Sequence, residues 1–529
     1  MNFQKTISQM LSDITCACPK RDAVVHTEIG IRYNYDRLSK EIDKVALGFL
    51  SRGIQSGDKV AIWAPNVPEW MIAMLALAKI GAITVPIDPA AEKDNLSYIL
   101  QQSETRALII TDDIIAKNVL EMTAAIKKES PKLEQIICIS DASGADILSW
   151  EELIAGGEEV ERKTLEKASN NVNPRDPVAI MYTSGTTGQP KGVVLDHIGL
   201  VNKSMVATER QGISSKDRLC LFFPLFHMFG NTCIALAGLL RGAALVMPCR
   251  TFNPAKVLQA IGAEECTAIY GSPSMLIALI DHPRFQKVDW VTLTKGIIGG
   301  APCPMELMRR IVEDIGVTAI TVAYGITETS SWITMTHPND ALELRVSTIG
   351  TALACNEVKI VDPASGDTLA YDQKGELCTR GFLMKEYHKM PAATAAAVDR
   401  EQWFHTGDLG VMDKKGYVRI TGRLKDVIVR NGVEIYPVEV EETIYQLPEI
   451  SEVQVFGFPD SKKEQEVAAW IKFKEDSQLS LEAVSEHVKT HLPTEKIPTY
   501  YKIVTEFPMT GSGKVQKFKM AQMAEMEYL

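Results

Sequence analysis

The sequence predicts an α/β fold, with a large N-terminal domain of layered sheets and helices and a small α+β domain at the C-terminal end. Up to about residue 420, short β-rich runs such as 59–63, 107–111 and 135–140 alternate with helical patterns such as 68–80. This alternation is typical of mostly parallel sheets that helices cover. After Trp403 the pattern changes to hairpins, which indicates a second folding unit.

The elements of the small domain follow from local turn and helix signals. A Gly-Val-Met-Asp-Lys-Lys-Gly run predicts a hairpin over 410–420, and the Asn431-Gly432 dipeptide predicts a second one, since it readily takes positive φ angles. Pro437 can begin an amphipathic helix, because the first helical residue needs no N–H. The remaining expected elements are strands at 453–456, 467–473 and 501–504 and a helix at 480–491.

The charged segment 421–426 joins the two patterns, and we expect the domain boundary there. The predicted domains are therefore a large one over 1–423 and a small one over 424–529. A length of 529 residues corresponds to three or four folding units of about 150 residues, so the large domain is expected to be layered into subdomains.

The composition excludes several classes of protein. An apolar fraction of 46% and a charged fraction of 23% are near the averages of globular proteins, which excludes disordered, collagenous and coiled-coil chains. A net charge of −11 provides no basic field for nucleic acid, so any anionic ligand must meet a local basic site. The 10 cysteines lack paired metal-ligand spacing, which favours reduced thiols in a cytoplasmic protein. No apolar run reaches the about 18 to 20 residues of a transmembrane segment.

A run of small and hydroxylated residues at 182–192 follows the apolar strand expected at 178–181. Its glycines let the backbone approach a polyphosphate, its hydroxyls donate hydrogen bonds, and Lys191 adds a positive charge. The run favours a phosphate cradle over an exposed Gly/Thr linker, because such a linker does not usually follow a buried strand. Gly192 after the lysine excludes a Walker A loop, which has Ser or Thr there. The residues expected at the phosphates are Thr183, Ser184, Gly185, Thr186, Thr187 and Lys191.

Five motifs together resemble the motif set of the adenylate-forming superfamily, which includes the acyl-CoA synthetases. They are the run at 182–192 and the segments 324–328, 406–408, 422–426 and 511–514. The motifs occur in the expected order and cover essentially the whole chain. Segments 209–230 and 301–304 are further similar to the medium-chain fatty acyl-CoA synthetase branch. The resemblance implies ATP, with AMP as a product, Mg2+ and coenzyme A as cofactors.

Glu328 has the chemistry of a magnesium ligand, since Mg2+ takes one or two carboxylates together with phosphate oxygens. Read alone, its alternative is a capping or surface carboxylate. The resemblance implies the catalytic, metal-binding role, with Thr327 on a phosphate and the Tyr324 ring, followed by Gly325, on the adenine. It also implies an adenine pocket whose small residues leave room for a planar base, namely Gly300, Ala301 and Pro302.

Asp408 follows a Thr-Gly turn, and its two oxygens could accept both hydroxyls of a ribose. An aspartate beside glycine is by itself more often a turn residue. The resemblance implies the ribose role and shares it with Arg423.

Lys514 lies in a Gly-Ser-Gly loop, where a solvated lysine is the default interpretation. The resemblance implies instead the catalytic lysine that bridges the substrate carboxylate and the α-phosphate, neutralising charge as two anions meet. It also implies a hinge at Lys425, about which the small domain rotates between the two half-reactions. The loop at Gly432 would then line a tunnel for the pantetheine of CoA.

His227 lies in an apolar segment, where a single histidine is usually a packing residue. The resemblance implies a gate between an acyl pocket and the CoA tunnel. The other residues that it places in the acyl pocket are Phe226, Gly271, Ser272, Gly299 and Val322. After Glu328 the sequence departs from the common Thr-Glu-Thr-Ser-Pro pattern, and Trp332 follows. We expect Trp332 to shorten the pocket and to favour a short-chain, alicyclic or aromatic acid.

The sequence therefore indicates an ATP- and Mg2+-dependent acid:CoA ligase that forms an acyl-AMP and then a thioester. The nearest alternative is an adenylating enzyme that loads a carrier protein supplied in trans, whereas an oxidative, luciferase-like enzyme would need oxygen. A non-catalytic homologue is disfavoured because the four expected polar site residues are present, namely Glu328, Asp408, Arg423 and Lys514. The acid, the direction of the reaction and the oligomeric state, a homodimer included, are left open.

Overall fold

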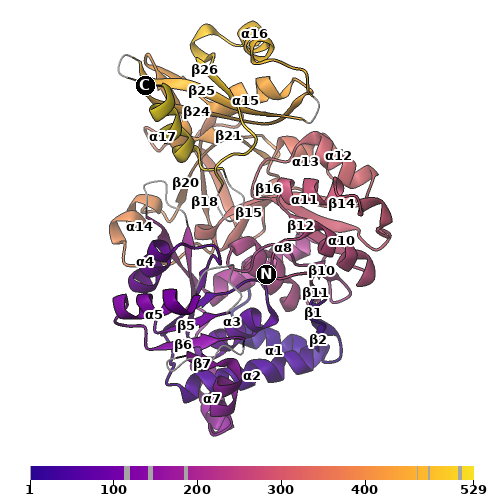
Figure 1. Cartoon of the computed structure of the whole chain (residues 1–529), viewed down its shortest axis with the longest axis vertical. Coiled ribbons are helices and arrows are strands. Elements are labelled where there is room, and N and C mark those ends of the chain that lie inside the picture. Colours follow the sequence, from indigo (N-terminus) through magenta and orange to yellow (C-terminus); the bar gives the residue numbers. More distant parts are fainter. Residues whose placement is uncertain are drawn as a thin grey trace. The chain divides into compact units, whose positions relative to one another are not determined.

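The computed structural model describes residues 2–111, 119–140, 147–183, 189–460, 463–474, 477–509 and 515–528 (Figure 1). By their contacts the residues form two compact units. The first comprises Met1–Glu357 and Arg380–Phe404, and the second comprises Val358–Thr379 and His405–Leu529. Within the described ranges, no helix combines the length and the apolar character that crossing a membrane requires.

The first unit contains two mixed sheets. The nine-stranded sheet has the order β16 (Thr351–Ala352), β15 (Ser331–Met335), β14 (Ala319–Ile326), β13 (Lys295–Gly299), β12 (Ala268–Gly271), β10 (Arg218–Cys220), β11 (Ala244–Met247), β1 (Asp22–His26), β2 (Ile31–Asn34). The eight-stranded sheet has the order β19 (Glu386–Tyr387), β9 (Lys191–Asp196), β8 (Pro177–Thr183), β4 (Ile83–Ile87), β3 (Lys59–Trp63), β5 (Ala107–Ile110), β6 (Gln135–Cys138), β7 (Ile147–Ser149). Inner strands pair in parallel and the antiparallel pairs lie toward the edges, as the alternating pattern predicts.

Helices connect these strands and cover the sheets. They are α1 (Ile7–Ala17), α2 (Tyr35–Ser51), α3 (Pro68–Ile80), α4 (Lys93–Ser103), α5 (Val119–Glu129), α6 (Trp150–Gly157), α7 (Arg162–Asn170), α8 (His197–Gln211), α9 (Ala237–Leu240), α10 (Pro254–Ala263), α11 (Pro273–Ile280), α12 (Met305–Glu313), α13 (Leu342–Ser347) and α14 (Pro391–Ala397). Three further elements are a π-helix, η1 (Phe229–Leu236), and two 3-10 turns, η2 (Phe285–Lys287) and η3 (Thr327–Thr329).

The helix predicted at 68–80 is confirmed as α3, and its bounds follow from local chemistry. Pro68 occupies the first turn, and Gly81 ends the helix in the left-handed conformation with φ 77°. Nearly every side chain of α3 is buried, so this helix lies inside the largest hydrophobic core, between elements of both sheets. Helix α3 is therefore an interior helix of the first unit, not an amphipathic surface helix.

The second unit contains the two remaining sheets. One has the order β17 (Glu357–Val361), β18 (Lys374–Arg380), β20 (Phe404–Met412), β21 (Val418–Arg423). The other has the order β23 (Val433–Ile435), β22 (Ile428–Arg430), β25 (Glu464–Phe473), β24 (Ile450–Asp460), and β26 (Tyr500–Ile503) also pairs with β25. The helical elements of this unit are α15 (Pro437–Tyr445), α16 (Leu481–His491), α17 (Lys517–Tyr528) and the 3-10 turns η4 (Leu424–Asp426) and η5 (Thr494–Lys496).

Both predicted hairpins are present in the second unit. Strands β20 and β21 pair antiparallel, with Gly416 at φ 84° in their turn. Strands β22 and β23 turn at Asn431 and Gly432, whose φ angles are 53° and 73°. Two consecutive positive φ angles are the reason why an Asn-Gly pair suits this turn.

The expected 423/424 division falls between the two sheets of the second unit. Strand β21 ends at Arg423, and η4 leads from it to β22. By contact, however, the sheet β17-β18-β20-β21 belongs with the C-terminal part, because its strands come from both 357–380 and 404–423 and cannot be separated without breaking the sheet. The compact unit thus begins at Val358, while the boundary of a mobile domain at 423/424 stays a prediction.

Candidate functional site

The two ends of the predicted phosphate loop are held side by side in the first unit. Strand β8 ends at Thr183 and β9 begins at Lys191, and these two residues are paired across the antiparallel ladder. The Thr183 hydroxyl donates to the Lys191 carbonyl at 3.5 Å. The other residues predicted at the phosphates lie outside the described residues, namely Ser184, Gly185, Thr186 and Thr187.

Tyr387 links the phosphate loop to the predicted magnesium ligand. It lies on β19, the edge strand that pairs with β9, and its hydroxyl donates to Glu328 Oε1 at 2.8 Å. The Lys191 ammonium lies 4.9 Å from the centre of the Tyr387 ring, at cation–π distance. Burial and the neighbouring Glu328 carboxylate both raise the pKa of Tyr387, so the hydroxyl keeps its proton and acts as a donor. Sequence reasoning missed Tyr387, since no local motif marks it.

Glu328 has no cationic partner among the described residues. It is half-buried in η3, its backbone carbonyl accepts from Met384 N at 2.7 Å, and it forms no ion pair within the described ranges. A half-buried carboxylate that meets one neutral side-chain donor among the described residues fits a hard cation such as Mg2+. The donor set therefore suits the predicted metal-binding role.

The backbone around Glu328 is strained. Ser330 and Ser331, which follow η3, have φ angles of 56° and 132°, values that side chains other than glycine rarely adopt. Gly325 is needed on the facing strand, because a Cβ there would lie 2.1 Å from the Ser331 carbonyl oxygen. Strained turns of this kind are concentrated at functional sites. Tyr324, predicted at the adenine, lies on β14 before this turn, and Thr327, predicted at a phosphate, is the first residue of the turn. Both are half-buried.

Trp332 fills the space above Gly299. A Cβ at position 299 would lie 3.0 Å from the edge of the indole ring, and the Phe229 ring packs against Trp332 at 5.0 Å and 80°. Trp332 is buried, and its indole N–H has no hydrogen-bond partner in the described part of the chain. The structure thus brings together two of the predicted acyl-pocket residues, Gly299 and Trp332.

The other predicted acyl-pocket residues are distributed more widely. Val322 packs in a separate core cluster, and a Cβ on Gly271 would contact Leu276 and Phe222 of that same cluster. Ser272 caps the N-terminus of α11, where its hydroxyl accepts from Met275 N at 3.4 Å. The pocket role of these three residues stays a prediction.

His227 and Phe226 are half-buried just before the π-helix η1. The Nδ1 atom of His227 accepts from Phe229 N at 3.1 Å, and its ring lies 5.4 Å from that of Phe223. Gly230 permits this tight segment, since a Cβ there would lie 2.2 Å from the Pro224 carbonyl oxygen. π-Helices are rare and occur frequently at functional sites. The predicted binding role of His227 stays a prediction.

The predicted adenine strip follows the end of β13. Gly300 has a φ of 88°, and the three strip residues are exposed, namely Gly300, Ala301 and Pro302. Their small exposed surface is compatible with a planar base lying against it.

In the second unit, the two predicted ribose residues contact each other. Asp408 on β20 is paired across the ladder with Arg423 on β21, and Arg423 Nε lies 2.7 Å from Asp408 Oδ1. Asp408 is buried whereas the arginine side chain is largely exposed. The arginine thus neutralises and orients the carboxylate. A carboxylate accepts hydrogen bonds on both of its oxygens, which is the chemistry that binding of hydroxyl groups needs.

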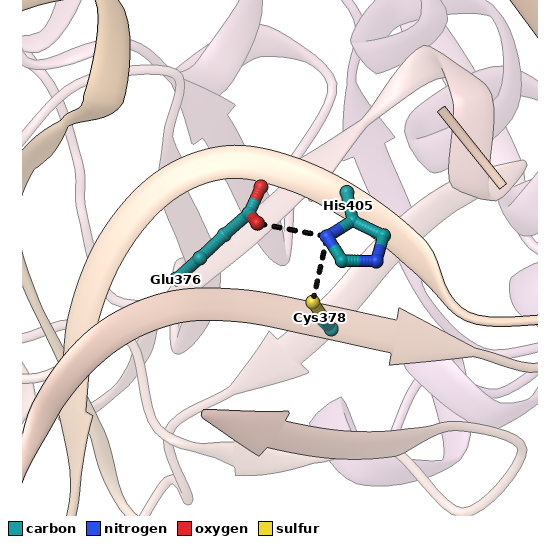
Figure 2. Close-up of side chains that lie close together, drawn as sticks. All are labelled: Glu376, Cys378 and His405. Atoms are coloured by element: carbon teal, nitrogen blue, oxygen red, sulfur yellow. Dashed lines mark hydrogen bonds and ion pairs between the residues drawn. The ribbon is translucent and has the colours of Figure 1, made fainter. Parts of the chain in front are cut away.

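Three further residues meet beside this pair. Figure 2 shows that Glu376 and Cys378, on β18, both point to the imidazole of His405, on β20. His405 Nδ1 lies 2.8 Å from Glu376 Oε2 and 3.5 Å from Cys378 Sγ. Sequence reasoning missed this group, because strand pairing rather than any motif brings its members together.

The remaining predicted residues lie elsewhere in the second unit. Lys425 is exposed in η4, at the junction of the two sheets. Gly432 occupies the tight turn between β22 and β23. Lys514 lies outside the described residues.

Comparisons with known proteins cover both parts of the chain. Residues 15–388 match the family model of the AMP-binding enzymes, and residues 439–514 match the model of the AMP-binding enzyme C-terminal domain. The chain is 40% identical to the putative acyl-CoA synthetase YngI of Bacillus subtilis, covering 98% of this chain and 97% of that protein. It is 34% identical to the human mitochondrial medium-chain acyl-CoA ligase ACSF2, covering 98% of this chain and 88% of that protein.

Solved structures share the fold over the full length. An ATP-bound RpMatB-BxBclM chimera has a TM-score of 0.88 and 26% identity, and the match covers 100% of both chains. The anthranilate CoA ligase AuaEII, in complex with anthranoyl-AMP, has a TM-score of 0.87 and 24% identity over 100% of this chain and 98% of that one.

Proposed function

Since the chain belongs to the AMP-binding enzymes, and within them to the AMP-forming acyl-CoA ligases, we propose that it activates a compact carboxylic acid. As an ATP-dependent, adenylate-forming ligase it acts on carboxylic acids. The finer proposal is a short- or medium-chain, alicyclic or aromatic acid, with free CoA as the acceptor.

The observation that carries the nucleotide part of the proposal is the group formed by Lys191, Tyr387 and Glu328. Lys191 lies over the face of the Tyr387 ring, and the Tyr387 hydroxyl donates to the Glu328 carboxylate. A cation and a carboxylate therefore lie close together at the base of the phosphate loop. A triphosphate with its metal ion needs both kinds of charge close together. Magnesium, when bound, would neutralise the triphosphate, and Glu328 is the residue that would hold it.

In the proposed first half-reaction, a carboxylate oxygen attacks the α-phosphorus, the bond to the bridging oxygen breaks, and pyrophosphate leaves. Lys191 supplies a fixed positive charge to the phosphates, and Asp408 accepts hydrogen bonds from the ribose hydroxyls. Lys514 is proposed to lie between the two reacting anions. In the second half-reaction the CoA thiolate attacks the acyl carbon, and the carbon–oxygen bond to AMP breaks.

The observation that favours a compact acid is the placement of Trp332. Its ring occupies the space beside Gly299, where a larger residue than glycine would meet the indole, and the Phe229 ring packs against it. A large, packed indole leaves less length for an alkyl chain than a small residue would. We therefore propose that Trp332 sets the upper limit of the acyl chain.

The test measures pyrophosphate release from the full-length protein with a panel of carboxylic acids, with and without CoA. We expect ATP- and acid-dependent release, with consumption of free CoA and formation of AMP. Consumption of a phosphopantetheinylated carrier protein but not of CoA would favour the carrier-loading alternative. If none of the acids in the panel supported pyrophosphate release, the proposal would be contradicted.

A pair of variants tests the limit on chain length. Trp332→Ala should raise kcat/KM at least about tenfold for acids that are longer by two methylene groups, because each methylene accommodated in an apolar pocket is worth about 1–3 kcal/mol. Trp332→Phe, which keeps an aromatic ring, serves as the matched control and should change the length preference much less. An unchanged preference in the alanine variant would remove Trp332 from the specificity argument.

A further inference from the structure

Both oxygens of the Glu376 carboxylate are committed to the turn that precedes Asp408. Glu376 Oε1 accepts from Gly407 N at 3.0 Å, and Oε2 lies 2.8 Å from His405 Nδ1 (Figure 2). Glu376 is buried, with 7% of its surface exposed, so these contacts are shielded from water. Hydrogen bonds to a shielded carboxylate are stronger and more directional than those on a surface.

The next residue of β18 holds the same turn at a third point. The Thr406 hydroxyl donates to the Leu377 carbonyl at 2.7 Å and accepts from Asp408 N at 3.1 Å. Gly407 has a φ of 70°, the left-handed conformation that a glycine adopts without strain. Each of the three residues before Asp408 thus bonds to Glu376 or to Leu377, while Arg423 contacts the Asp408 carboxylate itself.

A metal ion is the alternative explanation for a Glu, Cys and His group, since all three ligand atoms lie within 4.8 Å of one another. Zinc bonds of about 2.0–2.1 Å to N and O would place those two ligand atoms roughly 3.3 Å apart in a tetrahedral site. The observed 2.8 Å between Glu376 and His405 is instead the length of a charge-assisted hydrogen bond. The group is therefore explained by hydrogen bonds.

We propose that Glu376 is a positioning residue for Asp408, which it holds in place to receive the ribose hydroxyls of ATP. This inference rests on the proposed function, because it assumes that Asp408 contacts the ribose. Glu376 touches neither substrate in this proposal. It acts by fixing the backbone from His405 to Gly407, so that the Asp408 carboxylate is oriented before the nucleotide binds.

A glutamate suits this role because it offers acceptors on both oxygens. In Glu376→Gln the amide oxygen can still accept from Gly407 N, but the amide nitrogen cannot accept from a protonated His405 Nδ1 as the carboxylate does. The glutamine variant therefore retains one of the two contacts, whereas Glu376→Ala loses both. Glu357→Gln is a matched control, since Glu357 lies on the neighbouring strand β17 but is exposed and paired with Arg380.

The experiment compares ATP with 2′,3′-dideoxy-ATP, which lacks both ribose hydroxyls, in the full-length protein. Dissociation constants are measured by titration calorimetry, and kcat/KM is measured by pyrophosphate release. In Glu376→Ala we expect the preference for ATP over the dideoxy nucleotide to fall at least about tenfold, with affinity for the dideoxy nucleotide changed less than about twofold. Glu376→Gln should fall between this variant and the wild type, and Glu357→Gln should match the wild type.

Equal losses for both nucleotides would overturn the proposal, because a purely structural role lowers both alike. A wild type that binds both nucleotides equally would overturn it as well. Thermal unfolding midpoints of all variants are recorded, and if Glu376→Ala does not fold, the glutamine variant carries the test. Failure of the proposed function is seen separately, as absence of acid-dependent pyrophosphate release by the wild type.

Discussion

Glu328 and Asp408, the two carboxylates predicted at the nucleotide, are held in opposite ways. Glu328 lies half-buried in a strained 3-10 turn and is held by the neutral Tyr387 hydroxyl. Asp408 is buried in a strand ladder, and the Arg423 guanidinium contacts it at 2.7 Å. Within the described part of the chain the first has no counter-ion, whereas the second has Arg423.

The presence or absence of a counter-ion suits a carboxylate to one of two roles, binding a metal cation or binding hydroxyl groups. A carboxylate without a counter-ion attracts a metal cation, because binding the cation removes an unpaired charge. A carboxylate that is already neutralised gains little from a further cation but retains lone pairs that accept from neutral hydroxyls. The surroundings of each carboxylate therefore match the role that its motif implies.

Lys203 shows that an unpaired charge does not by itself indicate a ligand. It lies on α8, is fully buried, and donates to the Trp332 carbonyl at 3.2 Å and to the Asn356 side chain. No carboxylate lies within ion-pair distance of it in the described part of the chain, and burial lowers its pKa to about 8. Lys203 holds the backbone of strand β15 at Trp332 through neutral acceptors.

The largest expected effect comes from removing the uncompensated charge. Glu328→Gln should lower the rate of pyrophosphate release about 1,000-fold or more and abolish its saturation with Mg2+, because losing a preorganised electrostatic group costs about 100- to 1,000-fold or more. The rate is measured as a function of total Mg2+. Glu386→Gln, an exposed carboxylate next to Tyr387, is the control. A loss of less than about threefold would mean that the charge of Glu328 is not used.

Asp408→Asn should lower kcat/KM for ATP by about 100-fold, since hydrogen bonds to a charged group contribute about 1.5–3 kcal/mol. The Mg2+ dependence should stay that of the wild type, because this carboxylate already has Arg423 as its counter-ion. Both quantities come from the same pyrophosphate assay. A shift in the Mg2+ dependence would break the distinction between the two carboxylates.

Lys203→Met tests the buried charge through pH. The folded-state pKa of Lys203 is lowered from 10.5 to about 8, so between these values the unfolded chain binds more protons than the folded one. The free energy of unfolding of the wild type should therefore rise by about 2 kcal/mol from pH 8 to pH 10, and this rise should be absent in the methionine variant. Urea unfolding at the two pH values measures it.

The exposed Lys44 provides the control for that experiment, because Lys44→Met should keep the wild-type rise with pH. The same slope in Lys203→Met and in the wild type would show that Lys203 stays charged in the folded protein. The comparison uses differences in slope, so it tolerates a constant loss of stability from the two broken hydrogen bonds.

The smallest effect is expected from the hydroxyl that holds Glu328. Tyr387→Phe removes this hydrogen bond but keeps the ring face near Lys191, so we expect a five- to tenfold lower rate and a higher Mg2+ concentration at half-saturation, as for loss of about 1–1.5 kcal/mol. Tyr387→Leu also removes the ring and should lose a further few-fold. Identical Mg2+ curves for wild type and Tyr387→Phe would show that Glu328 is positioned without Tyr387.

The sequence by itself determined the features that depend on neighbours along the chain. Pro68 and Gly81 bound a buried helix, and Asn431 with Gly432 forms a tight turn, because caps and turns follow from the φ angles that a few adjacent residues allow. The motifs also singled out Glu328 and Asp408 as nucleotide-binding residues, and those roles stay predictions.

Only the tertiary structure decided which residues distant in the sequence contact the predicted site residues and the turn before Asp408. Tyr387 lies 59 positions from Glu328, Glu376 lies 31 positions from Gly407, and Lys203 lies 129 positions from Trp332. The pairing of β19 with β9 and the sheet that holds β18 and β20 bring the first two together, and the packing of α8 on β15 brings the third. Strand partners are chosen by burial and register across the whole sheet, so no local pattern of residues could have revealed these contacts.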